Sequence, residues 1–77
     1  MNEQEIIRLI GEALGVDPAQ LSRESKAGDF EQWDSMGLLA ILAQLDRQGV
    51  HFDPGNAVAL QTMQGILEAF RQARKLD

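Results

Sequence analysis

The stretch Trp-Asp-Ser-Met-Gly-Leu-Leu-Ala-Ile-Leu-Ala-Gln-Leu, residues 33–45, decides the expected fold. At 100° per residue its large aliphatic side chains fall on one side of a helix, which predicts the central helix of the core, from about Ser35 to Gln48. Asp34 can cap this helix by accepting from the unpaired amides of its first turn, and Gly49 can end it. The core side is expected to hold Leu38, Ile41, Leu42 and Leu45, with Leu39 widening it.

The opposite side of this helix carries small and apolar residues where a solvated helix normally carries charges. Its members are Met36, Gly37, Ala40, Ala43, Gln44 and Arg47. An exposed surface made mostly of small and apolar side chains predicts a docking site for another protein. The candidate partner-binding residues are therefore Gly37, Ala40, Ala43 and Arg47, together with Trp33. For Trp33 two interpretations stay open, because the indole could either anchor the preceding loop to the core or face the partner.

Two further helices are expected around the central one. Asn2 can cap the first, whose apolar residues recur at three and four spacing up to Leu14, and Gly15 ends it. Thr62 can cap the last, whose apolar side comprises Met63, Ile66, Leu67, Phe70 and Ala73. Asp17-Pro18 predicts a single turn, residues 56–60 predict at most one short helix, and residues 22–34 form a long loop. The expected fold is all-α, with three main helices and one short one.

Length and composition restrict the function. The 77 residues, with a net charge of −5, predict a single domain over residues 1–77 with one modest core and no second lobe to close an active-site cleft. We therefore expect a monomer that is not an enzyme. The excess negative charge argues against nucleic acid as a partner, and the absence of a signal peptide or long apolar segment predicts a cytoplasmic protein without a membrane partner. With no cysteine and only His51, no metal site is expected.

Taken together, these features resemble the acyl carrier protein family. The resemblance covers nearly the whole chain: a first helix, a long loop, an Asp-Ser-Leu type motif that opens the central helix, a short helix, and a Thr-capped last helix. The matching residues are Trp33-Asp34-Ser35-Met36 and, later, Leu60-Gln61-Thr62-Met63. The tetrapeptide Asp34-Ser35-Met36-Gly37 is also similar to that of D-alanyl carrier proteins, so the cargo stays open between acyl and aminoacyl groups.

The resemblance implies a cofactor and a site. In this family the serine of the motif receives 4′-phosphopantetheine from coenzyme A, and the thiol of that arm carries acyl groups as thioesters; Ser35 is the matching position. It also implies that Asp34 helps to position the phosphopantetheinyl transferase, and that Met36 lies beside the attached arm. The implied partners are this transferase, a ligase or synthase that loads the cargo, and the enzymes that act later in the pathway.

The chain departs from carriers of primary fatty acid synthesis, which usually present acidic residues along the central helix. Gly37 and Ala40 stand where such acids are common, and Arg47 adds a positive charge. We therefore expect a carrier dedicated to one biosynthetic pathway for a lipid or secondary metabolite. The alternative from another class is an unmodified helical adaptor that binds one partner through the exposed face of the central helix.

Overall fold

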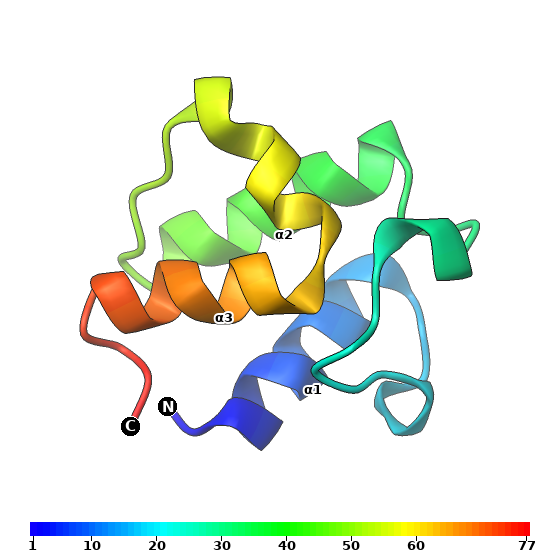
Figure 1. Ribbon diagram of the computed structural model, residues 1–77, viewed down its shortest axis with the longest axis horizontal. Helices are drawn as coiled ribbons and strands as arrows, with labels where there is room; N and C mark the ends of the chain where they lie inside the picture. The colour runs from blue at the N-terminus through cyan, green and yellow to red at the C-terminus, as the bar shows by residue number, and fades with distance from the viewer.

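The computed structural model is an all-α bundle, as the sequence predicts. It describes the backbone of residues 1–77 and every side chain except that of residue 54. The main helices are α1 (Glu3–Leu14), α2 (Ser35–Arg47) and α3 (Met63–Gln72). Three 3-10 helices, η1 (Pro18–Gln20), η2 (Ala27–Asp29) and η3 (Pro54–Gln61), lie in the connections. The short helix predicted at residues 56–60 is present as the longer η3, and η2 lies inside residues 22–34, which the sequence predicts as a loop. In Figure 1, α1 packs against α2 and α3, and η3 packs between α2 and α3.

The predicted helix boundaries are confirmed by hydrogen bonds at the caps. Asn2 Oδ1 accepts from the Glu5 amide at 2.8 Å while the Glu5 carboxylate accepts from the Asn2 amide at 2.9 Å, so a capping box begins α1. Gly15 ends α1 with φ at 74°, a left-handed conformation that glycine adopts at little cost. Thr62 Oγ1 caps α3 by accepting from the Gly65 amide at 3.0 Å.

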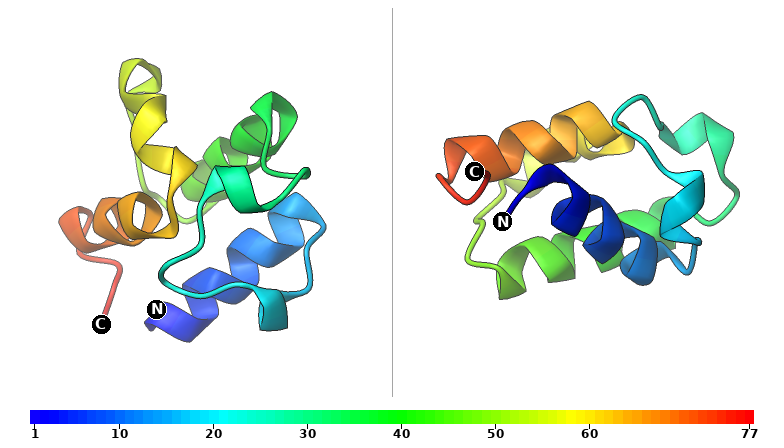
Figure 2. Two further views of the ribbon diagram at one scale, coloured as in Figure 1. Left: turned by 45° about the vertical axis from the view of Figure 1, so that its right-hand side comes forward. Right: turned by 90° about the horizontal axis from the view of Figure 1, so that it is seen from below.

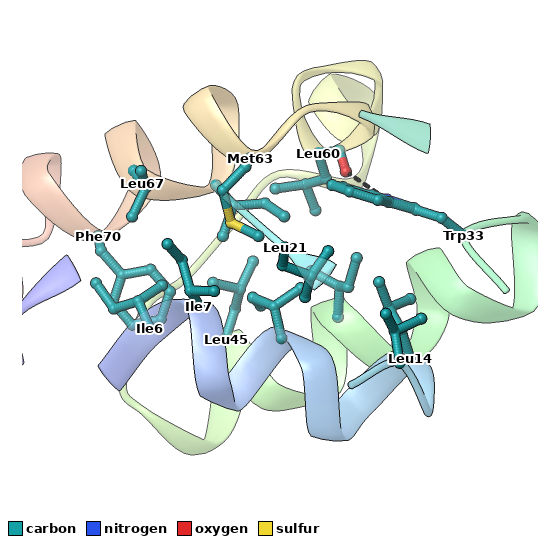
Figure 3. Packing of buried hydrophobic residues seen from close by; sticks show 14 of the residues in the cluster. Ile6, Ile7, Leu14, Leu21, Trp33, Leu45, Leu60, Met63, Leu67 and Phe70 are labelled. Atoms are coloured by element: carbon teal, nitrogen blue, oxygen red, sulfur yellow. Dashed lines mark hydrogen bonds between the residues drawn. The ribbon is translucent and has the colours of Figure 1, made fainter. Parts of the chain in front are cut away.

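The core consists mainly of aliphatic side chains from the three α-helices and their connections, and Trp33 and Phe70 are its buried aromatic residues (Figure 3). Its fully buried members include Ile6 and Ile10 of α1, Ile41 and Leu45 of α2, and Met63, Ile66 and Phe70 of α3. The prediction that Leu39 widens the core side of α2 is wrong, because Leu39 is 60% exposed. Leu38 and Leu42 are half-buried and pack against the core edge, which leaves Leu39 on the solvent side of α2.

Figure 2 shows the path of the long loop between η1 and α2, and hydrogen bonds join this loop to the starts of α1 and α3. The amide of Met63 donates to the carbonyl oxygen of Ser25 at 2.9 Å, and Lys26 forms an antiparallel bridge with Thr62, so the loop pairs with the start of α3. Arg23 donates two hydrogen bonds to the Glu3 carboxylate, at 2.8 and 3.0 Å. These hydrogen bonds and the negative charge of Glu3 raise the pKa of the Arg23 guanidinium. The loop thus holds a defined path up to the first residue of α2.

Candidate functional site at the start of the second helix

Ser35 is the first residue of α2, and its side chain is exposed. Asp34 precedes it as the N-cap in an extended conformation, and its Oδ1 accepts from the Gly37 amide at 3.0 Å. This confirms the predicted capping role of Asp34. The cap fixes the first turn of α2, so the serine hydroxyl is presented to solvent on a rigid helix end where the helix dipole favours negative charge.

Gly37 is the third residue of α2 and is buried, so the prediction that it belongs to an exposed partner-binding surface is wrong. A β-carbon at position 37 would collide with the carbonyl oxygen of Gln32 and come within 2.8 Å of the Leu14 Cδ2 atom. The turn formed by residues 30–34 crosses directly over the helix at this point, and only glycine leaves room for it. Gly37 therefore brings the end of the loop, the start of α2 and the end of α1 together.

Trp33 is only 3% exposed, so its assignment to partner binding is also wrong. Its indole Nε1 donates to the carbonyl oxygen of Leu60 at 3.1 Å, which Figure 3 shows as a dashed line. The alternative interpretation, in which the indole anchors the long loop to the bundle, is confirmed. Burying such a large side chain two residues before Ser35 gives the loop end a strong hydrophobic attachment.

The remaining predicted partner-binding residues stay at or near the surface of α2. Ala43 and Arg47 are exposed, and Ala40 is half-buried. Met36, placed beside Ser35 by the motif, is 73% exposed. Leu39, which sequence reasoning assigned to the core, joins them instead. Val58 of η3 is also 72% exposed, and η3 packs beside α2. The exposure of Val58 could not be predicted, because the short segment around it has no helical apolar periodicity.

Three acidic residues surround the approach to Ser35. Asp29, Glu31 and Asp34 lie within six residues of Ser35 in the chain, and all three are exposed. They give the start of α2 a local negative charge, whereas the exposed Arg47 lies at the other end of the helix.

The two hollows that lie around the 51–56 segment and α3 are not lined by Ser35 or its neighbours. A groove of about 350 Å³ lies between the 51–56 segment and the end of α3, and a hollow of about 250 Å³ continues it along η3. The two share Phe52, Asn56, Ala69 and Gln72, which sequence reasoning did not connect because they lie in segments far apart in the chain. His51 lines the larger groove, and no three potential metal ligands come together among the described residues. Met63 and Ile66 of α3 are fully buried in the core and line neither hollow.

None of the helices formed by the described residues has the length and hydrophobicity needed to span a bilayer. Comparison of the chain with models of known protein families, with curated proteins and with solved structures found no match.

Proposed function

We propose that this protein is a discrete carrier of acyl or aminoacyl groups that uses a 4′-phosphopantetheine arm attached to Ser35. The observation that supports this proposal is the position of Ser35, an exposed hydroxyl on the first turn of a 13-residue helix whose start is fixed by Asp34. The three-plus-one helix arrangement around it agrees with the family resemblance of the sequence.

The residues around Ser35 fit a phosphodiester-linked arm. The Ser35 side chain is exposed, so a bulky substituent would meet no core residue. The partial positive charge of the α2 N-terminus favours the negative phosphodiester at this position. Met36 is 73% exposed and supplies a flexible apolar surface next to the attachment point. The thiol at the end of the arm would supply what a chain without cysteine lacks, a group that carries cargo as a thioester.

Attachment requires one displacement at phosphorus. The Oγ atom of Ser35 forms a bond to the phosphorus that bears the pantetheine, the pyrophosphate P–O bond of coenzyme A breaks, and 3′,5′-ADP leaves with the electron pair. The hydroxyl proton passes to a base of the transferase. This chain supplies the nucleophilic oxygen and its fixed position, whereas the transferase supplies the metal ion and the acid–base groups.

In this proposal the protein is not itself an enzyme. Its single core offers no second lobe, and the loading of cargo belongs to a ligase or synthase. Residues 35–45 of α2 carry no acidic side chain, which supports a carrier dedicated to one pathway rather than one shared by many enzymes with basic docking patches.

A second function, an unmodified helical adaptor, is favoured by one observation. Met36, Leu39 and Val58 are large apolar side chains that stay exposed in the monomer, as expected of a surface that binds a partner whether or not Ser35 is modified. In an adaptor, Ser35 would only begin the helix.

Intact mass spectrometry separates the two functions. The wild-type protein is incubated with coenzyme A, magnesium and a promiscuous phosphopantetheinyl transferase, beside Ser35→Ala and the matched control Ser22→Ala, which removes another exposed serine hydroxyl. A carrier gains one phosphopantetheine mass in the wild type and in Ser22→Ala but not in Ser35→Ala. No gain in any of the three, with a control carrier modified in parallel, would contradict the carrier function and favour the adaptor.

A further inference from the structure

A continuous groove runs between the segment that precedes η3 and the end of α3. Its larger part, of about 350 Å³, lies beside residues 51–53, and its smaller part, of about 250 Å³, lies along η3 and α3. Both parts are lined by Phe52, Asn56, Ala69 and Gln72, so they adjoin. We call the two parts together the η3–α3 groove. Its larger part alone has the size of small-molecule sites, about 300–1,000 Å³.

The groove has an apolar floor and a polar rim. Phe52, Ala69 and Ala73 are half-buried and pack against the core, so they form the floor. The rim consists of exposed polar side chains, namely His51, Asp53, Asn56 and Gln72. Such a floor takes the methylene groups of a ligand out of water, and the ring of Phe52 attracts a cation.

Two carboxylates line the groove, one in each part. Asp53 lines the larger part and Glu68 the smaller, and none of the described lining residues is a lysine or an arginine. Asp53 Oδ1 accepts from the Gly55 amide at 2.9 Å, and this carboxylate has no ion-pair partner among the described residues. Glu68 is paired with Arg71 at 3.0 Å, but their side chains are 46% and 63% exposed, so the pair contributes little and is easily replaced. The groove therefore favours a cationic ligand.

We propose that the η3–α3 groove binds a small aliphatic diamine, with one ammonium group at Asp53, the other at Glu68, and the methylene chain between them over Phe52. An ammonium group has three N–H donors and no acceptor, which suits carboxylate oxygens and the side-chain carbonyl oxygens of Asn56 and Gln72. The net charge of −5 attracts a dication toward the chain. A metal ion would make no use of the apolar floor, and no three potential metal ligands come together among the described residues. The diamine site is independent of the carrier function.

The experiment titrates amines into the full, unmodified and isotope-labelled chain at constant ionic strength and follows the backbone amides by two-dimensional NMR. The probes are 1,4-diaminobutane, 1,6-diaminohexane and 1,8-diaminooctane, each beside the monoamine of the same chain length. We expect the largest shifts at the amides of Phe52, Asn56 and Ala69. The tightest diamine should bind with a Kd of about 1 mM, about threefold tighter than its monoamine, because an exposed ion pair adds little free energy.

Two substitutions test the two ends of the ligand separately. Asp53→Asn keeps an acceptor for the Gly55 amide but removes the charge, and it should weaken binding of diamines and monoamines about threefold. Glu68→Gln should weaken binding of the diamines alone, because a monoamine uses the carboxylate that has no ion-pair partner. The matched control is Asp17→Asn: Asp17 Oδ1 likewise accepts from an amide two residues further on, that of Ala19 at 3.0 Å, and lies outside the groove. It should leave each Kd nearly unchanged, and thermal melting confirms that every variant is folded.

Three results would overturn the diamine site and leave the carrier function standing. Shifts centred on another part of the surface, or diamines that bind no tighter than their monoamines, would contradict the paired carboxylates. Equal effects of Asp53→Asn and Asp17→Asn would mean that only the net charge of the chain attracts the amines. Tighter binding of Nα-acetyl-lysine methylamide than of every diamine would mean that the groove receives a lysine side chain of another protein instead.

Discussion

The indole Nε1 of Trp33 lies 3.1 Å from the carbonyl oxygen of Leu60, to which it donates a hydrogen bond across 27 positions of sequence. This bond joins the residue two positions before Ser35 to the end of η3. The position of the candidate site thus depends on a contact between the long loop and a distant 3-10 helix.

Replacing Trp33 with Phe should destabilise the protein. The Leu60 carbonyl would lose its indole donor, and the smaller ring would leave space in the core, so we expect a loss of about 1–3 kcal/mol in the free energy of unfolding. Urea unfolding followed by circular dichroism measures this, with Gln32→Ala as an exposed neighbouring control. A variant as stable as the wild type would show that the indole is not an anchor.

Gly37→Ala should destabilise the protein even though alanine is the better helix former by about 1 kcal/mol. The added methyl group would meet the Gln32 carbonyl and the Leu14 side chain, and we expect a net loss of about 1–3 kcal/mol.

The matched control for this prediction is Gly28→Ala. No atom lies within 4 Å of a β-carbon built at position 28, so this change should be neutral or stabilise the protein by up to about 1 kcal/mol. Equal effects of the two substitutions on thermal melting would contradict the close approach at Gly37.

The two roles expected of Asp34 can be separated by two substitutions. Asp34→Asn keeps an N-cap acceptor for the Gly37 amide and should leave stability within about 0.5 kcal/mol, whereas Asp34→Ala should cost about 1 kcal/mol. If the carboxylate also contacts the transferase, Asp34→Asn lowers kcat/KM for modification several-fold although the fold is intact. Unchanged kcat/KM would limit Asp34 to capping.

Gly65→Ala tests how η3 is seated on α3. A β-carbon at position 65 would run into the backbone carbonyl of Ala59, so η3 should be pushed away from α3, at a cost of about 1–3 kcal/mol. Hydrogen exchange should then be faster in η3 than in α1. The exposed neighbour Gln64→Ala is the control, and unchanged exchange in Gly65→Ala would refute the predicted displacement.

The helices and their caps could be predicted from the sequence because they depend on local chemistry. Asn2, Asp34 and Thr62 each accept hydrogen bonds from amides three residues further along the chain, a pattern that is visible in the order of residues alone. The apolar spacing of α1 and α3 likewise identified their buried sides.

The predictions for Gly37 and Trp33 were wrong because their burial depends on the path of the long loop. Gly37 is buried because the loop crosses α2 there, and no local pattern specifies that crossing. The indole of Trp33 donates a hydrogen bond to a backbone carbonyl. Because every residue has such a carbonyl, the sequence does not indicate that Leu60 is the acceptor. Leu39 lies at the border between the two sides of α2, where helical periodicity alone does not determine burial.

The crossing at Gly37 connects the candidate site to complete folding of the domain. Leu14 from α1, the Gln32 carbonyl from the loop and the start of α2 meet there, while Trp33 requires the end of η3. A chain still emerging from the ribosome has not yet supplied Leu60, so it cannot hold the first turn of α2 in this arrangement. An enzyme that recognises this turn would therefore modify completely synthesised and folded chains and would not modify nascent ones.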